Sequence, residues 1–231
     1  MKQNFFFLFA LVTSVALFAA TPVGASGQVT LNIQYAGKAI IGLSGTGQAT
    51  IDWGDGTRVE TYTLQFAITP FSHNYSNATP RTVTITGENI RGLVCQNMGI
   101  TNLDVTKITT LSVLDCSRNK ITSLNLGNNT DLRHLTCSDN LLTTFDVSQI
   151  EWLGHIRCSN NQITSLNVSK NRAIKSFFID HNKLNRNEME NFLRSLHANV
   201  PNGGKVVDIS NNPAAGANAG IARDSGWSVT N

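Results

Sequence analysis

The chain has 231 residues, 41% of them hydrophobic and 14% charged, which is typical of a folded protein and excludes a disordered one. Removing residues 1–25 takes away Lys2 and leaves 17 Lys and Arg against 15 Asp and Glu, a net charge of +2. No cluster of basic residues is visible, so we expect no nucleic-acid partner.

Residues 1–25 predict a secretory signal peptide. Lys2 supplies a positive start, an apolar stretch runs from Phe5 to Ala20, and Val23-Gly24-Ala25 offers a small-residue cleavage site. Polar residues interrupt the stretch and no basic stop-transfer cluster follows it, which favours cleavage over a membrane anchor. We therefore expect an exported protein, secreted, periplasmic or at the cell surface, with no integral membrane segment after cleavage.

Residues 26–89 predict a small all-β domain. Short segments of alternating polarity, such as Val29–Ile33 and Ala49–Trp53, are separated by turns rich in Gly and Asp. This pattern is typical of an antiparallel β-sandwich. The run Asp52–Thr57, followed by His73-Asn74-Tyr75, resembles the polycystic-kidney-disease (PKD) type of immunoglobulin-like module.

Two residue types in this domain have alternative interpretations. Asp52 and Asp55 lie near glycines, as calcium ligands often do, but their spacing departs from the D-x-D-x-D-G loop, and Asp55-Gly56 makes a good hairpin turn by itself. The structural interpretation is therefore preferred. Trp53 is expected to be a packing residue, although an exposed Trp53 would favour sugar stacking.

Residues 90–186 contain one 21-residue pattern written five times. The cysteines are spaced 21 residues apart, and apolar residues recur five and two positions before each of them and five after; the cysteine position is occupied by Cys95, Cys116, Cys137, Cys158 and then Ile179. A polar residue also returns three positions after the cysteine in all copies but the first: Asn119, Asn140, Asn161 and Asn182. This is the L-x-x-L-x-C-x-x-N-x-L signature of leucine-rich repeats.

The resemblance is closest to internalin-like surface proteins of bacteria. It implies a right-handed leucine-rich repeat solenoid in which stacked coils bury a common core and form one parallel sheet. Four cysteines in an exported protein ordinarily suggest disulfides. Here, equivalent positions on neighbouring strands lie about 4.8 Å apart, while disulfide Cβ atoms lie about 3.8 Å apart. We therefore expect a buried ladder of free thiols, and no metal site or cofactor.

The outward positions of the sheet vary in chemistry, whereas the inward positions barely change. This contrast is expected of a recognition surface on a constant scaffold. The candidate partner-binding residues on this concave face are Val113, Asp115, Arg118, His134, Thr136, Asp139, His155, Arg157, Phe178 and His181. No third ligand or nucleophile accompanies the two neighbouring histidines in a recognisable motif, so no catalytic residue is assigned.

Residues 187–231 predict a cap that closes the stack. Asn187 and Glu190 resemble a capping box, and apolar residues at helical spacing predict a helix over about residues 188–197. A turn at Pro201–Gly204 leads to a last strand with Asn212 in the ladder position, and Trp227 is expected to anchor the tail.

Taken together, the patterns predict a mainly β protein: a PKD-like sandwich, a leucine-rich repeat solenoid and a cap that contains a helix. We expect a monomeric, non-enzymatic protein, and the family resemblance implies that it binds a protein partner through its concave face, in adhesion or in a host or cell-surface interaction. The alternative is a glycan-binding accessory protein that uses the sandwich module, Trp53 and Phe178. Neither a catalytic dyad with persuasive spacing nor a phosphate-binding loop is found, which disfavours an enzyme.

Overall fold

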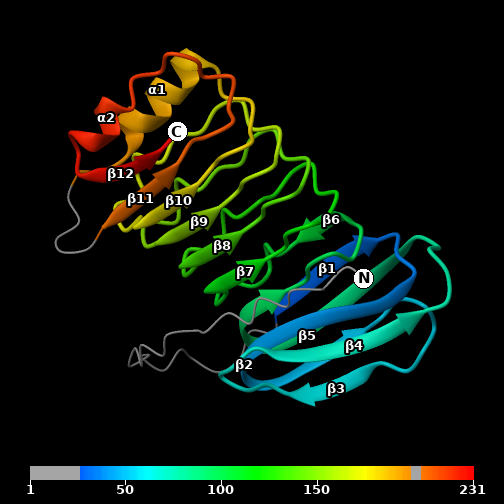
Figure 1. The fold of residues 1–231 in the computed structure, drawn as a ribbon. Coiled ribbons are helices and arrows are strands. Elements are labelled where there is room, and N and C mark those ends of the chain that lie inside the picture. The colour runs from blue at the N-terminus through cyan, green and yellow to red at the C-terminus, as the bar shows by residue number, and fades with distance from the viewer. Residues whose placement is uncertain (1–26, 199–203) are drawn as a thin grey trace, which may run out of the picture.

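The computed structural model describes residues 27–198 and 204–231. The predicted signal peptide and most of the predicted turn at residues 201–204 lie outside these ranges. The described part is mainly β, as expected, and its twelve strands belong to one hydrogen-bonded sheet. Figure 1 shows an N-terminal group of long strands that continues into a stack of short coils, with both helices at the far end of the stack.

The first six strands are longer than the three-residue strands of the coils that follow, and they pair antiparallel with one another. They are β1 (Gly27–Ile33), β2 (Gly37–Asp52), β3 (Glu60–Thr63), β4 (Thr69–Tyr75), β5 (Arg81–Val94) and β6 (Ile100–Asp104). Along one edge, β2 pairs first with β4 and later with β3, while its other edge pairs with β5. One long strand thus organises the N-terminal part.

The change of partner along β2 occurs at a bulge beside Gly45. This residue has φ of 152°, and its main-chain N–H donates to the oxygen of Gln65 at 2.8 Å. A side chain there would collide with the main-chain oxygen of Asn89 on β5. Only glycine fits such a close approach of two backbones, so the bulge depends on this residue type.

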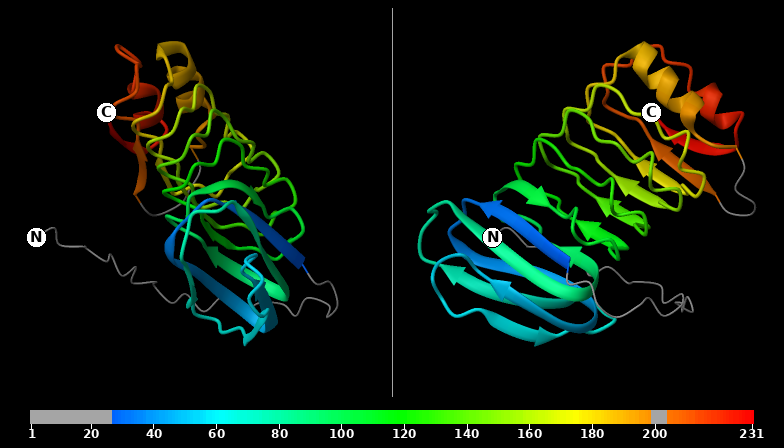
Figure 2. Two further views of the ribbon diagram at one scale, coloured as in Figure 1. Left: turned by 90° about the vertical axis from the view of Figure 1, so that its right-hand side faces the viewer. Right: turned by 180° about the vertical axis from the view of Figure 1, so that it is seen from behind.

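The repeats form a leucine-rich repeat solenoid, which confirms the prediction from the 21-residue period. Each coil contributes a three-residue strand: β7 (Val113–Asp115), β8 (His134–Thr136), β9 (His155–Arg157) and β10 (Ser176–Phe178). The strands pair parallel and in register from β5 through β10, so that Leu114, Leu135, Ile156 and Phe177 lie side by side. Figure 2 shows these strands as one layer along a single side of the stack.

The four cysteines lie in a single buried file inside this stack. Each is free and has no exposed surface, which confirms the predicted thiol ladder. Burial raises the pKa of each thiol well above its usual range. The cysteines therefore act as small apolar residues rather than as reactive groups.

The repeated asparagines hold consecutive coils together. Asn140 accepts a hydrogen bond from the main-chain N–H of Ile121, and its amide nitrogen donates to the oxygens of Cys116 and Cys137. One side chain thus satisfies main-chain groups in its own coil and in the coil before it. The same contacts recur at Asn119, Asn161, Asn182 and Asn212.

A second asparagine position on the convex side was not recognised from the sequence. Asn129 and Asn171 occupy the place that Ile108 and Ile150 hold in alternate coils, and all four are buried. Asn171 donates to the oxygens of Val147 and Ile150 at 2.7 and 2.8 Å. The side-chain oxygens of both asparagines have no hydrogen-bond partner in the described structure.

The junction between the two parts is a continuous sheet. The predicted boundary between residues 89 and 90 falls inside β5, which pairs with β1 over residues 81–87 and with β7 over residues 92–94, while β2 pairs with it over residues 84–94. The convex side of the first coil forms β6, which pairs antiparallel with β1. The N-terminal strands and the solenoid are therefore joined by main-chain hydrogen bonds in one sheet. The division of the chain into domains stays a prediction.

The cap at the other end contains two helices and two strands. They are α1 (Arg186–Ser195), β11 (Lys205–Asp208), α2 (Gly220–Arg223) and β12 (Trp227–Thr230), and both strands continue the parallel sheet. Phe192 of α1 packs edge-on against Phe177, with ring centroids 5.0 Å apart. Trp227 is buried as expected, and Lys205, also buried, donates its amine to the main-chain oxygens of His197 and Ala198.

The predicted start of the helix was wrong by two residues. Asn185, not Asn187, caps α1, because its side-chain oxygen accepts a hydrogen bond from the main-chain N–H of Glu188. The pattern Asn-x-x-Glu is written twice in succession here, and pattern alone does not choose between the two. Glu190 instead pairs with Arg186 and Arg194 on its own helix.

Candidate interaction surface

All ten predicted contact residues lie on the sheet surface that faces away from the core. Seven of them lie on β7 to β10 and three in the turns that follow, and none is buried. Strand register sets His134 beside Val113 and His155, and sets Arg157 beside Thr136 and Phe178. The residues were predicted from spacing alone, and their role in binding remains a prediction.

His134 and His155 stack face to face on neighbouring strands. Their ring centroids are 4.7 Å apart with an interplanar angle of 8°, and Nδ1 of His155 lies 2.8 Å from Oγ of Ser176. Burial, and then the charge of His155, lower the pKa of His134. Burial, followed by the charges of Lys175 and Arg157, lowers the pKa of His155. Both rings are therefore neutral at pH 7 and present a polar, uncharged patch.

The guanidinium of Arg157 lies over the ring of Phe178. The guanidinium carbon is 4.2 Å from the ring centroid, a cation–π contact worth about 0.5–1 kcal/mol at an exposed site. The side chain of Arg157 makes no ion pair or hydrogen bond within residues 27–198 and 204–231. The ring thus holds the guanidinium in place while its N–H groups face solvent.

The turn residues Arg118, Asp139 and His181 belong to a column with a backbone requirement. Every member has φ between 54° and 58°, the left-handed region; the column is Asn97, Arg118, Asp139, Asn160, His181 and Asn211. Asn, Asp and His tolerate this conformation better than most residues. Residue choice in this column thus has a structural cause, and these three residues are weaker candidates for recognition than the strand residues.

Asp115 and Asp180 are already engaged by neighbouring groups. Asp115 accepts hydrogen bonds from the N–H and hydroxyl of Ser117 and from the side chain of Gln96. Asp180 accepts one from Ser159 and lies 3.0 Å from Nδ1 of His181. These carboxylates stabilise the turns at the edge of the sheet.

Two basic residues near the histidine stack were not predicted. Arg133 directly precedes β8 and Lys175 directly precedes β10, and Lys175 is close enough to lower the pKa of His155. The signal was present in the sequence: Arg91, Arg133 and Lys175 recur at a spacing of two coils, 42 residues. A spacing of 42 residues is not visible in a pattern that repeats every 21.

The N-terminal strands also contribute to the outer face. Ile68, in the loop between β3 and β4, lies over the sheet where Gly42 and Gly92 carry no side chain; a Cβ on Gly92 would stand 2.6 Å from Cδ1 of Ile68. Phe66 in the same loop is 83% exposed. The N-terminal end of the outer face is therefore bordered by the apolar loop between β3 and β4. The spacing of the repeats did not predict this position of the loop.

Trp53 is a packing residue, as expected, and its exposure of only 1% contradicts the alternative of a sugar-stacking platform. Its indole N–H donates to Glu60 at 2.9 Å, and its ring stacks on His73, which pairs with Asp55 at 2.6 Å. The hydrogen bond from Thr57, followed by that from His73, lowers the pKa of Asp55 to about 2. Asp55 thus acts in the turn, as the structural interpretation of this segment expected.

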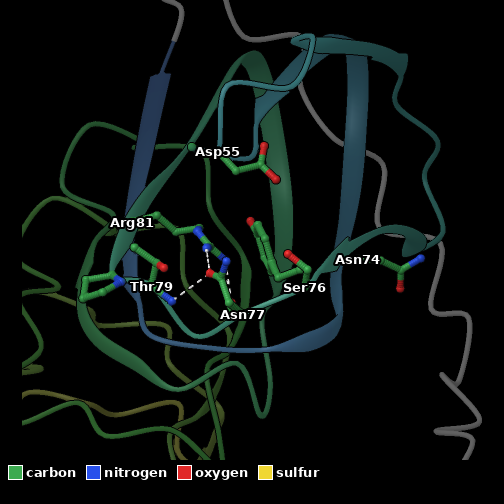
Figure 3. A pocket seen from close by; sticks show the side chains of 9 residues that line it. Asp55, Asn74, Ser76, Asn77, Thr79 and Arg81 are labelled. Carbon is green, nitrogen blue, oxygen red and sulfur yellow. Dashed lines mark hydrogen bonds between the residues drawn. The ribbon is translucent and has the colours of Figure 1, made fainter.

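A shallow hollow of about 370 Å³ lies beside this cluster (Figure 3). Arg81 is one of the residues that line it; its side chain donates to Oδ1 and the main-chain oxygen of Asn77 and lies 4.1 Å from the centroid of the Tyr75 ring. Three of the residues that line it, Asn77, Thr79 and Arg81, thus bind one another. Among the described residues, no three His, Cys, Asp or Glu side chains gather as metal ligands. No described helix is long and apolar enough to cross a bilayer.

Comparison with known proteins gives structural neighbours only. The sequence matches no protein-family model and no curated protein. Among solved structures it is similar to an internalin (inlF) from Listeria monocytogenes, at 23% identity and a TM-score of 0.46, over 55% of this chain and 36% of that one. It is also similar to the functional domain of InlJ from Listeria monocytogenes, described as including a cysteine ladder, at 24% identity and a TM-score of 0.40, over 59% of this chain and 34% of that one. The chain spans about a third of the length of each match.

Proposed function

We propose that this protein is an exported, non-enzymatic recognition protein that binds a protein partner through the outer face of its parallel sheet. The observation that carries the proposal is the contrast between the two faces of the same strands. Inward positions repeat the same apolar residues and are buried, whereas outward positions differ from coil to coil. Packing explains the first set, and binding explains the second.

The chemistry of the outer face supports a protein partner. An aromatic ring with an arginine held against it, a histidine stack and a flanking apolar loop combine apolar contact with directed hydrogen bonding. Aromatic residues and arginine are the types most often found at the centres of protein interfaces. The leader-like residues 1–25 support export to a place where such a partner would be met.

The one arrangement that resembles catalytic machinery is the contact between His155 and Ser176. A serine nucleophile needs a base whose far nitrogen is held by an acid, together with donors for the developing oxyanion. The far nitrogen of His155 has no carboxylate partner in the described structure, and one face of its ring is covered by His134. The pair therefore supports a binding role.

A paired capture experiment tests this function. The mature protein, carrying a photo-activated cross-linker, is exposed to the surface proteins of cells from its environment, alongside Phe178→Ala and Arg157→Glu. Matched controls are Trp152→Ala, which removes an aromatic residue that is 59% exposed outside the strands, and Arg172→Glu, in an exposed turn before β10. We expect a defined protein to be captured by the wild type and by both controls, and lost with both sheet variants. Capture that depends on Trp152 or Arg172 instead would contradict the proposal.

A further inference from the structure

Three cations and the neutral histidine stack lie together on three adjacent strands of the outer face. We define the basic band as Arg133, His134, His155, Arg157 and Lys175, which lie on or directly before β8, β9 and β10. Neighbouring strands of a sheet are about 4.8 Å apart, so the band is roughly 10 Å across. A surface of this width is large enough to contact one or two side chains of a partner.

The cations of the band lack acidic partners within the described residues. Lys175 and Arg157 make neither an ion pair nor a hydrogen bond through their side chains there. The side chain of Arg133 donates only to the main-chain oxygen of Leu132, at 3.4 Å. By contrast, Arg118, Arg186 and Arg194 outside the band each lie within 4.0 Å of a carboxylate. The three cations of the band are therefore available to an external anion.

The geometry of the band suits a carboxylate. Contact with Phe178 uses no N–H group of Arg157, and a planar guanidinium with free N–H groups binds a carboxylate through two parallel hydrogen bonds. Because the ring already restrains the side chain, little conformational entropy is lost when the anion binds. Phe178 itself offers an apolar surface next to the bound charge.

The carboxylates around the band favour an anion with a single negatively charged group over an extended polyanion. Asp115 on β7, Asp139 and Asp180 in the turns, and Asp208 on β11 surround it. An extended polyanion, such as a polyuronic acid or a nucleic acid, would meet these carboxylates in any direction along the sheet. A single acidic side chain with apolar neighbours avoids them.

From this arrangement we infer that the partner is a polypeptide that places an Asp or Glu side chain, next to an apolar residue, on the basic band. The inference rests on the proposed function and specifies the partner of the same surface. The acidic group lies between Arg157 and Lys175, and its apolar neighbour covers Phe178.

The histidine stack makes this binding depend on pH. His134 lies between His155 on β9 and β7, which carries Asp115. His155 lies between His134 and Ser176 of β10; Lys175, directly before β10, and Arg157, on the same strand as His155, are the charged groups near it. Burial first, and then the neighbouring positive charges, lower the pKa of both rings; a bound carboxylate offsets the effect of the charges, so binding is accompanied by proton uptake. Affinity therefore rises between pH 7.5 and pH 5.5, where Asp and Glu of the partner stay ionised.

Selection from a library of random 12-residue peptides tests the inference. The immobilised mature protein is the target, and dissociation constants are measured for enriched peptides by fluorescence anisotropy. We expect Asp or Glu beside an apolar residue, and at least tenfold weaker binding after Asp→Asn or Glu→Gln in the peptide. The double variant Arg157→Gln with Lys175→Gln should weaken binding by a similar factor, and the two losses should not multiply. The matched control is Arg172→Gln with Lys183→Gln, both exposed outside the band.

Each other outcome overturns a stated part of the account. Neutral peptides that still require Phe178 would overturn the acidic partner and leave the proposed function standing. If no enriched peptide depends on the outer face, the proposed function fails as well. Binding of polygalacturonate that requires Arg157 and Lys175, without any acidic peptide, would replace the polypeptide by an anionic glycan.

Discussion

The side-chain amide nitrogen of Asn119 donates a hydrogen bond of 2.9 Å to the main-chain oxygen of Cys95, one coil earlier in the chain. Each later ladder asparagine repeats this contact with the cysteine of the preceding coil or with Ile179. The ladder thus connects each coil to its neighbour through main-chain atoms that strand pairing does not reach. This buried network holds the outer face in register.

Removal of one ladder side chain should destabilise the whole stack. Asn140→Ala leaves several buried main-chain groups without partners, among them the N–H of Ile121 and the oxygen of Cys116. We expect the free energy of unfolding to fall by about 3 kcal/mol, since each unsatisfied buried group costs about 1–3 kcal/mol. Chemical denaturation monitored by circular dichroism measures it. Asn191→Ala, at an exposed position of α1, is the control and should change stability by under about 0.5 kcal/mol.

Replacement of a convex asparagine should change stability much less than replacement of a ladder asparagine. Asn129→Ile removes a buried oxygen that has no partner and restores the residue type that alternate coils already accommodate. Replacement of a polar group by an apolar one of suitable shape is nearly neutral or stabilising. We expect a change within about 1 kcal/mol of wild type in the same denaturation experiment, although two donated hydrogen bonds are lost. A loss as large as that of Asn140→Ala would show that the two asparagine positions are equivalent.

The thiols should be inert in the native protein. All four are fully buried and unpaired, and burial raises their pKa well above the usual value, so almost no thiolate is present at pH 8. Ellman's reagent should therefore react with none of them before denaturation and with all four after it. A reducing agent should leave the melting temperature unchanged. Rapid reaction of any thiol in the native state would contradict the buried file.

The histidine stack should make the fold less stable in acid. The pKa of both rings is lowered in the folded protein, and unfolded histidine titrates near 6.5. The contribution of the neutral rings is thus fully present above pH 6.5 and is lost as pH falls below it, because the unfolded chain binds protons first. Denaturation at pH 7.5 and 5.5 should show a smaller loss of stability for His134→Gln with His155→Gln than for wild type.

Removal of the His155 ring should change the pKa of His134. His155→Gln removes a like charge from beside His134, and the pKa of His134 should therefore rise. Titration of its ring protons or nitrogens by nuclear magnetic resonance between pH 4 and 8 measures this shift. An unchanged or lowered pKa would mean that the rings do not interact in solution.

How much of this structure the sequence could predict depended on the range of the interactions. The period of 21 residues predicted the cysteine file, the asparagine ladder and the order of outward residues, because stacking repeats every local choice. Asn129 and Asn171 were overlooked because they return only every second coil. The pairing of β1 with β6, and the position of Ile68 over Gly92, join segments far apart in the chain and have no local signal.

The candidate surface shows the same division. Register alone brought His134 next to His155, and Arg157 next to Phe178, as the spacing predicted. The stacking of the rings, and the absence of acidic partners for Lys175 and Arg157 in the described structure, depend on side-chain conformation and could not be predicted from spacing. The burial of Trp53 depends on contacts with Glu60 and His73, which lie on other strands.

Hydrogen–deuterium exchange of the mature protein, alone and with its captured partner, tests the central claim most directly. The account predicts that the partner slows exchange at Val113–Asp115, His134–Thr136, His155–Arg157 and Ser176–Phe178, and leaves the convex turns unchanged. Protection confined to the convex turns or to the strands before Arg81 would contradict it.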